Sequence, residues 1–191
     1  MKTHRNGYGT YLAQAAHGLQ ADATVTEPNA MEARVKFAGH PVHQMLIVFP
    51  LGLLSTAVIF DAIHLATGSV TASMSSYWMI AAGVIGGLCA AVFGVVDWWA
   101  IPKGTRAYRL GLLHGIGNVC VVALYAVSWF LRRPDPGHPS ATALITMLVG
   151  AILSLLTGWL GGELVDRLGV GVDDGANLDA PSSLSKKTAR L

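Results

Sequence analysis

The sequence predicts an all-α fold, a four-helix transmembrane bundle of up-down-up-down topology with disordered polar tails at its two ends. Of its 191 residues, 52% are hydrophobic and 13% are charged, whereas soluble domains contain about 25% charged residues. The mean hydropathy is +0.49. Four runs lack Asp, Glu, Lys and Arg, and each is long enough to cross the ~30 Å hydrocarbon core as a helix. These runs are residues 41–60, 75–96, 110–131 and 141–162.

The composition leaves room for one membrane domain, predicted over residues 36–170. Residues 1–35 and 171–191 are polar and are expected to form the tails; no apolar core of a signal peptide follows Lys2 and Arg5. The formal net charge is +2 and the basic residues form no stripe, which argues against a nucleic-acid partner. Cys89 and Cys120 lie inside apolar runs and are expected to be buried thiols rather than a disulfide.

The first helix is expected to begin at Pro41, since proline is favoured at the first helical position. Pro50 lies inside the run and cannot bond the carbonyl of Leu46, so a kink is predicted there. The helix should end near residues 66–68, where Gly68 follows Thr67.

The other helices are bounded by capping and breaking residues. The second is expected to start after Ser75 and Ser76 and to stop before Pro102. The third should follow residues 103–106 and run to Leu131, and the fourth should start near Ser140 and stop at Gly169. Small residues recur every four positions on the fourth helix and predict a closely packed ridge: Gly150, Ser154, Gly158 and Gly162.

The basic residues near the helix ends predict the orientation. One side of the membrane collects Arg34, Lys36, Lys103, Arg106, Arg109 and Arg167, and the other has Arg132 and Arg133. We therefore expect a multi-pass protein of a bacterial inner membrane with both termini in the cytoplasm.

Alternation of the four spans predicts that several ionisable residues meet at the cytoplasmic end of the bundle. The expected ligands are His40, His43, Asp97, His114 and Glu163, with Asp166 beside them. Such groups are costly in a membrane and often mark function. Imidazole with carboxylate suits transition metals, and two histidines on facing helices suit haem iron. The sequence thus predicts haem b or a transition metal in an electron-transfer role, with a redox partner protein or quinone.

A second function remains open because polar residues continue along the third helix. Asn118 and Tyr125 fall on the face of His114, and Asp61 and His64 are expected to form a polar pair at the outer end. These residues would suit transport of protons or small solutes. A third interpretation is a non-catalytic assembly subunit or homo-oligomer held by the glycine ridges. Each ionisable residue also has a purely structural interpretation, such as pairing of Asp97 with Lys103 or Arg106, or of Glu163 with Arg167.

Several motifs resemble a bacterial family catalogued as domain of unknown function 2231. They are Gly-His-Pro-Val-His-Gln-Met-Leu-Ile-Val-Phe-Pro at residues 39–50, Asp97-Trp98, His114, and Gly-Gly-Glu-Leu-Val at residues 161–165. The resemblance covers roughly residues 34–172 and implies an uncharacterised four-helix membrane protein. Fusion of some members to Rieske-type iron–sulfur domains implies a redox setting. The family often has a histidine before Gly-Val-Gly-Val, where this chain has Leu168, so no ligand role carries over to that position.

Overall fold

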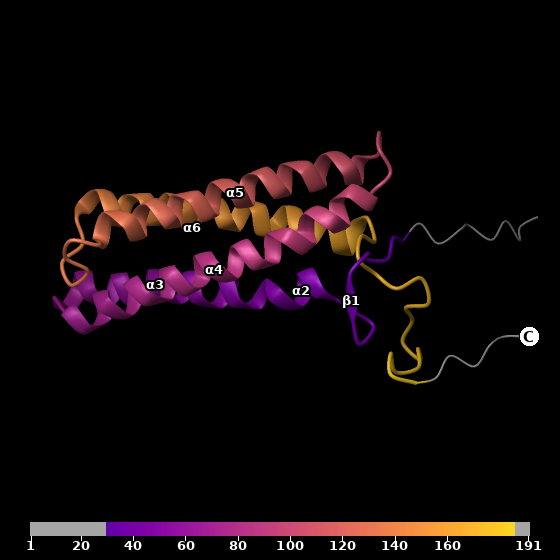
Figure 1. Ribbon diagram of the computed structural model, residues 1–191, viewed down its shortest axis with the longest axis horizontal. Helices are drawn as coiled ribbons and strands as arrows, with labels where there is room; N and C mark the ends of the chain where they lie inside the picture. Colours follow the sequence, from indigo (N-terminus) through magenta and orange to yellow (C-terminus); the bar gives the residue numbers. More distant parts are fainter. Residues whose placement is uncertain (1–29, 186–191) are drawn as a thin grey trace, which may run out of the picture.

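The computed structural model describes residues 30–185, which form an elongated bundle of antiparallel helices (Figure 1). The helices are α2 (Val42–Leu46), α3 (Val48–Thr67), α4 (Val70–Ala100), α5 (Arg106–Arg132), α6 (Ala141–Gly162) and the π-helical turn η1 (Glu163–Arg167). Within the described residues, α2 with α3, α4, α5, and α6 with η1 make four spans long and apolar enough to cross a membrane. The predicted four-helix transmembrane fold is therefore confirmed, and the chain is an integral membrane protein.

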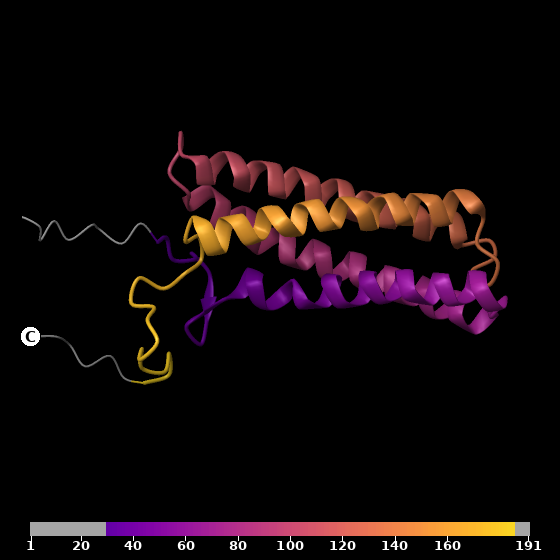
Figure 2. The ribbon, with the colours of Figure 1, turned by 180° about the vertical axis from the view of Figure 1, so that it is seen from behind.

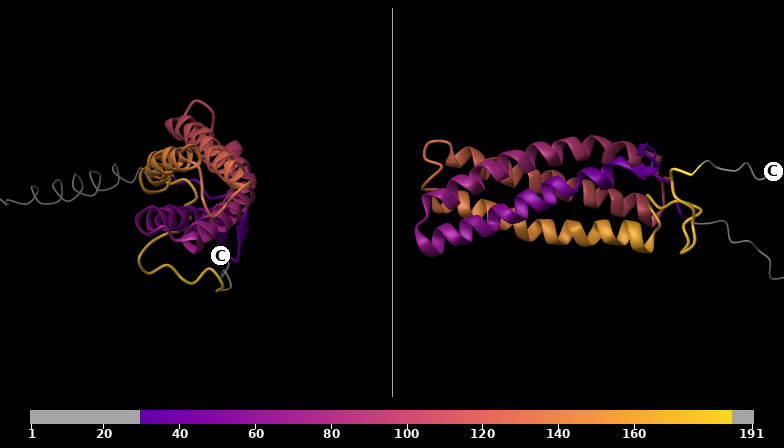
Figure 3. Two further views of the ribbon diagram at one scale, coloured as in Figure 1. Left: turned by 90° about the vertical axis from the view of Figure 1, so that its left-hand side faces the viewer. Right: turned by 90° about the horizontal axis from the view of Figure 1, so that it is seen from below.

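The spans are arranged as two helical hairpins. The α3 helix packs along α4 and α5 packs along α6, and the α4–α5 contact joins the hairpins (Figures 1 and 2). The first span begins, α4 ends, α5 begins and η1 lies at one end of the bundle (Figure 3). This end is here called the histidine end because His43 is in α2 and His114 is in the histidine-end half of α5. The opposite end, where α5 ends at Arg132, is here called the arginine end.

The first span is interrupted at Ile47, three residues before Pro50, in the turn where the sequence predicts a kink. Helix α2 ends at Leu46 and α3 starts at Val48, with Ile47 between them. Proline has no N–H to donate to the carbonyl four residues earlier, so the helical ladder fails at this turn. The start differs by one residue from the prediction, because Pro41 is the extended N-cap and belongs to the short strand β2.

Hydroxyl side chains cap the other helices. Ser69, Thr105 and Ser140 each accept a hydrogen bond from the backbone N–H three residues later, which satisfies one of the free donors of the first turn. The predicted start of the second helix after Ser76 is wrong, because the cap at Ser69 starts α4 at Val70.

The buried apolar core is small and central. It consists of Leu54, Ala57, Ile80, Val121, Tyr125 and Met147. Most other large apolar side chains lie on the outside of the bundle, where lipid can solvate them. Cys89 and Cys120 are free and exposed on this outer surface, so the expectation that both thiols are buried is wrong.

The glycine ridge of α6 is only partly a packing surface. Tyr125 lies against Gly150, where an added Cβ would be 3.2 Å from the ring. At Gly158, by contrast, no atom lies within 4 Å of such a Cβ. A strict four-residue repeat drifts around a helix of 3.6 residues per turn, so the contact line moves from Gly150 to Thr157 and Gly161.

The described parts of the two tails contact each other at the histidine end. Strands β1 (Lys36–Phe37) and β2 (His40–Pro41) form a small hairpin. Met31 bridges in parallel to Val170, with its N–H bonded to the Gly169 carbonyl at 2.9 Å. The expected disorder of residues 1–29 and 186–191 concerns positions outside the described residues.

Candidate functional site

His43, the second residue of α2, points into the first hairpin. Its Nδ1 lies 2.9 Å from the carbonyl oxygen of Ala90 on α4. A carbonyl can only accept, so Nδ1 must carry a proton, and in the neutral ring Nε2 then has a free lone pair. The ring lies against Gly94, where a Cβ would be 2.8 Å from Cε1 of His43. The hydrogen bond to Ala90 therefore orients the imidazole, and the absence of a side chain at Gly94 leaves room for the ring.

His114 on α5 is held by the second hairpin in the same manner. Its Nδ1 lies 2.9 Å from the carbonyl oxygen of Thr157 on α6, so this ring also donates from Nδ1. It lies against Gly161, where a Cβ would be 3.1 Å from Cε1 of His114. Both histidines are half-buried, and they lie at the same end of the bundle on two different hairpins.

The polar face of α5 continues from His114 into the bundle, as the sequence predicts. Asn118 donates from Nδ2 to the His114 carbonyl at 2.9 Å and lies 3.2 Å from Nε2 of the same histidine. Thr157 donates its hydroxyl to Oδ1 of Asn118 at 3.2 Å. Tyr125 is 1% exposed and belongs to the central core. This face is therefore turned inward.

The remaining predicted ligands lie at the histidine end but have separate partners. Oδ1 of Asp97 accepts hydrogen bonds from the backbone N–H groups of Arg34 at 2.7 Å and Val35 at 3.4 Å. It therefore anchors the segment before β1. His40 is exposed, with Nε2 3.4 Å from the Ser183 hydroxyl.

Glu163 pairs with Arg106 at 2.7 Å across the hairpin, rather than with Arg167 on its own helix, and Asp166 is exposed. Within residues 30–185, no three His, Cys, Asp or Glu side chains are grouped so that they could hold a metal ion. The structure thus places His43 and His114 at the same end of the bundle, one in each hairpin, but does not assemble the five predicted ligands into one centre.

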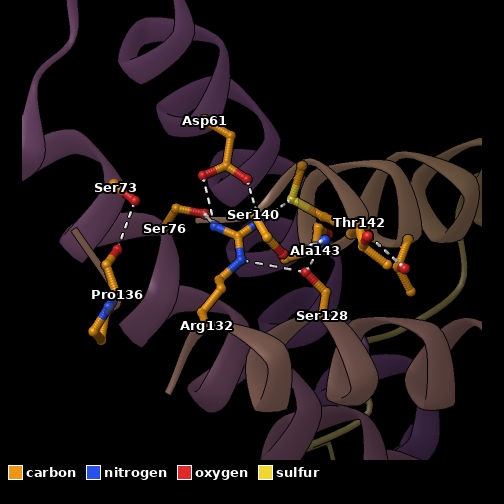
Figure 4. Close-up of polar contacts among 11 residues, drawn as sticks. Asp61, Ser73, Ser76, Ser128, Arg132, Pro136, Ser140, Thr142 and Ala143 are labelled. Atoms are coloured by element: carbon orange, nitrogen blue, oxygen red, sulfur yellow. Dashed lines mark hydrogen bonds and ion pairs between the residues drawn. The ribbon is translucent and has the colours of Figure 1, made fainter. Parts of the chain in front are cut away.

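The arginine end contains a buried ion pair that the sequence interpretation missed. Arg132 on α5 is 0% exposed and Asp61 on α3 is 1% exposed. The guanidinium donates from Nη1 to Oδ1 of Asp61 at 2.8 Å and from Nη2 to Oδ2, as Figure 4 shows. Such a two-pronged contact is the strongest geometry for arginine and carboxylate. It joins the two hairpins.

Hydroxyl groups complete the surroundings of this pair (Figure 4). Ser76 accepts from Nη1 of Arg132 and Ser128 accepts from Nε, both at 3.3 Å. The expected outer pair of Asp61 with His64 is not formed, because Nδ1 of His64 donates to the Ser69 carbonyl at 2.9 Å. Arg132, expected to be a loop charge, is instead the largest fully buried side chain of the described residues.

Sequence comparison gives partial matches to curated glycerol-3-phosphate acyltransferases. The chain is 28% identical over 108 residues to a glycerol-3-phosphate acyltransferase of Sinorhizobium medicae (strain WSM419), covering 56% of this chain and 51% of that one. The enzyme of the same name from Sinorhizobium fredii (strain NBRC 101917 / NGR234) is 28% identical over 109 residues, covering 56% and 52%. The chain thus spans about half the length of the curated relatives it matches. No solved structure matches it.

A family model matches most of the chain. It covers residues 39–174, from Gly39 directly before His40 to Asp174 beyond η1, and so includes all four spans with His43 and His114. The family is described as "Predicted membrane protein (DUF2231)". The transmembrane bundle with His43 and His114 at one end therefore belongs to the DUF2231 family of membrane proteins.

Proposed function

We propose that this chain is a membrane electron-transfer protein that binds haem b through Nε2 of His43 and Nε2 of His114. The observation that carries the proposal is the pair of imidazoles, one from each hairpin, whose Nδ1 atoms both donate to helix carbonyls. A histidine fixed in this manner presents Nε2 to a metal in a set orientation.

The donor set favours haem over a non-haem metal. A transition metal without a macrocycle needs at least three protein ligands in its usual protein sites, and no such group occurs within the described residues. Haem iron takes four ligands from its macrocycle and needs one or two from the protein. Two neutral imidazoles meet this requirement, and Gly94 and Gly161 leave the rings free of steric conflict.

The residues around the histidines have defined tasks in this proposal. When bound, haem supplies a reversible one-electron couple. The carbonyls of Ala90 and Thr157 hold the two rings in the required tautomer. Asn118 approaches Nε2 of His114 and must give up that contact on binding, but it keeps its bonds to the His114 carbonyl and to Thr157.

An absorption spectrum of the full-length protein tests the proposal. The chain is produced with haem precursor in the medium and purified from membranes in mild detergent. We expect a Soret band, a sharp α-band after reduction, and about one iron per chain. His43→Ala and His114→Ala should each abolish the Soret band.

Two variants serve as controls. His64→Ala should keep the spectrum, because its ring bonds the Ser69 carbonyl at the other end and lies about 30 Å from His43 along the first span. His40→Ala should also keep it. A wild-type protein without a Soret band contradicts the haem proposal. If it also contained no metal, the wider metal proposal would fail with it.

A proton-transfer protein is the second candidate, supported by the length of the polar face of α5. This inward face carries His114, Asn118, Tyr125, Ser128 and Arg132, and it leads to Asp61 at the arginine end. Reconstitution in liposomes with a pH-sensitive dye tests this candidate. Flux that is lost in both His114→Ala and Tyr125→Phe would support it, and absence of flux would exclude it.

The similarity to glycerol-3-phosphate acyltransferases supports a third, weaker candidate. An enzyme of that name must bind a phosphate group, which calls for free cationic side chains. At the histidine end, Arg106 is paired with Glu163 and Lys36 with Glu32, whereas the exposed Arg34, Lys103, Arg109 and Arg167 are the cations that a phosphate could reach. These cations are spread over separate segments of the chain, so the histidine pair remains the basis of the proposal.

We further propose that the histidine end faces the cytoplasm of a bacterial inner membrane. The burial of Arg132 supports this orientation, because a paired interior charge does not act as a loop charge. The arginine side then has only Arg133 as a basic residue near the helix ends. The histidine side has Arg34, Lys36, Lys103, Arg106, Arg109 and Arg167. A redox protein or quinone would meet the haem there.

A further inference from the structure

The two hairpins hold their histidines in matching ways. In each hairpin the histidine lies on the first helix, in the half nearer the histidine end, and donates to a carbonyl of the second helix. The glycine four residues after that carbonyl receives the ring: Gly94 follows Ala90, and Gly161 follows Thr157. In both cases a Cβ would meet the histidine atoms in the same order, Cε1, then Nδ1, then Nε2.

The correspondence between the hairpins extends from the histidines to the residues of the buried ion pair. Asp61 follows His43 by 18 residues, and Arg132 follows His114 by 18. Leu54 and Tyr125 occupy corresponding places between them, and both belong to the core. Leu54 lies against Gly83 and Tyr125 against Gly150, and these glycines precede Gly94 and Gly161 by the same interval.

Burial follows the same correspondence. Buried positions of the second helices pair as Ile80 with Met147, Ser76 with Ala143, and Ala90 with Thr157. Both hairpins start at the same end of the bundle (Figure 1), so a rotation about an axis along the bundle relates them. Parallel repeats of this kind place shared sites at the interface of the two halves.

We infer that the bundle consists of two equivalent hairpins, and that His43 and His114 are equivalent donors to one ligand on the axis between them. This inference rests on the proposed function for the identity of the ligand. If haem binds there, His43 and His114 would both hold its iron, and the bound group would supply one-electron transfer. With both histidines engaged, no position at the iron would be left for an added ligand, so the protein would act as an electron carrier rather than as an enzyme that binds oxygen.

The buried ion pair gives the two halves a unique mutual arrangement. Asp61 and Arg132 occupy corresponding positions but have opposite charges, so each hairpin presents the partner that the other needs. Two identical residues at these positions would repel or leave a buried charge unpaired. The pair therefore sets the hairpins in register at one end while the histidines meet at the other.

Cross-linking of the full-length chain tests the pairing independently of haem. In a background with Cys89→Ala and Cys120→Ala, His43→Cys and His114→Cys are introduced together and treated with a short bifunctional thiol reagent. Trypsin then cuts the exposed α4–α5 loop at Lys103. We expect the two halves to stay joined on a denaturing gel. His64→Cys with His114→Cys is the matched control, and its halves should separate.

A second pair, Pro50→Cys with Val121→Cys, retains both histidines and occupies the next corresponding positions inward. Pro50 and the neighbour of Val121, Val122, both contact the position of a Cβ at Gly87. Cross-linking of this pair supports the two-fold arrangement even if the histidine variant does not fold. Separation of the halves in both pairs overturns the inference.

The spectrum of wild-type protein with carbon monoxide tests the closed coordination. The reduced spectrum should not change when the gas is added, whereas His43→Ala and His114→Ala, after reconstitution with haemin, should lose binding to the same extent. A carbon monoxide complex in the wild type, or retention of haem by one variant, overturns the equivalence but leaves haem binding intact. If the cysteine pairs cross-link but the wild-type protein has no Soret band, haem binding is rejected and the pairing of the two hairpins is kept.

Discussion

Each imidazole at the histidine end depends on a neighbouring residue that has no side chain. The rings of His43 and His114 occupy the space that a Cβ would take at Gly94 and Gly161. Because protein interiors are closely packed, even one added methyl group displaces the neighbouring atoms. A ring displaced in this way would lose its aligned hydrogen bond to Ala90 or Thr157, and with it the fixed direction of Nε2.

Gly94→Ala and Gly161→Ala should therefore weaken haem binding without removing a ligand. We expect a loss of about 10–100-fold, as is usual when the groups that orient a metal ligand are disturbed. Titration of purified protein with haemin measures the affinity. Gly158→Ala is the control, since no atom lies near its Cβ position. Equal affinities in all three variants would show that the rings do not need this space.

The exposed turn before α6 contains a hydrogen bond whose contribution to stability depends on pH. Nδ1 of His138 lies 3.0 Å from Oδ2 of Asp135, and this side-chain hydrogen bond holds the pKa of Asp135 below its ordinary value of 3.8. A carboxyl group with a lowered pKa stabilises the fold above its ordinary pKa. That contribution is lost as the pH falls through the lowered value.

Asp135→Ala should therefore remove part of the pH dependence of stability below about pH 4. Thermal unfolding in detergent between pH 3 and pH 6 measures this, and the variant should lose less stability than the wild type as the pH falls. Because the pair is exposed, the effect should be small. Parallel curves for the two proteins would contradict the assignment.

At the scale of helices, the α3–α5 contact depends on the paired charges of Asp61 and Arg132. A buried ion pair contributes little net stability when complete, but loss of one partner leaves a charge without compensation. We expect Asp61→Asn or Arg132→Gln to destabilise the bundle by about 3–5 kcal/mol. Arg133→Gln, on the exposed side of the same turn, should cost under about 1 kcal/mol.

Exchange of the two charges should restore much of the lost stability. The variant with Asp61→Arg and Arg132→Asp keeps a pair at corresponding positions of the two hairpins, although the surrounding Ser76 and Ser128 are not exchanged with it. Unfolding in detergent, compared with the two single variants, measures the recovery. A double variant that is no more stable than the worse single variant would show that the surroundings dominate.

The spans were predictable from local properties, whereas the pairing of charged residues was not. The capping hydroxyls, Pro50 and the apolar runs act within one helix, so their effects can be read from neighbouring residues. Arg132 could be seen to share the face of His114 and Tyr125, but its position next to Arg133 and Pro134 made it resemble a loop charge. Its partner Asp61 lies on another helix, and only packing decides that the carboxylate meets Arg132 rather than His64.

The histidine end shows the same limit. Alternation of the spans correctly predicts which residues share an end, because it depends on helix direction alone. Helix direction does not determine how each helix is rotated about its axis, or where the segment before the first span runs. Asp97 therefore bonds the backbone at Arg34 and Val35, and Glu163 bonds Arg106, so neither carboxylate orients an imidazole.

For the whole molecule, the asymmetry of exposed basic residues predicts which end faces the cytoplasm. Trypsin should cut the α4–α5 loop at Lys103 in inside-out vesicles and not in right-side-out vesicles. At the arginine end, Arg133 precedes Pro134 and is therefore not a trypsin site, so Arg133→Cys with a membrane-impermeant thiol reagent should show the opposite pattern. Cleavage of the α4–α5 loop from the outer side would reverse the orientation but would leave the fold and the histidine pair unchanged.

The bond between Met31 and the segment around Val170 brings the two flanks of the membrane domain together. The two ends of the membrane domain are thus close enough to be joined by a linker, and new termini can be made in another loop. A circularly permuted chain that starts at Thr105, passes from η1 through a flexible linker to Ala30, and ends at Ile101 should fold to the same bundle with its hairpins in reversed order. If the permuted protein gave the wild-type spectrum and melting temperature, the covalent order of the two halves would be a matter of ancestry and not of architecture.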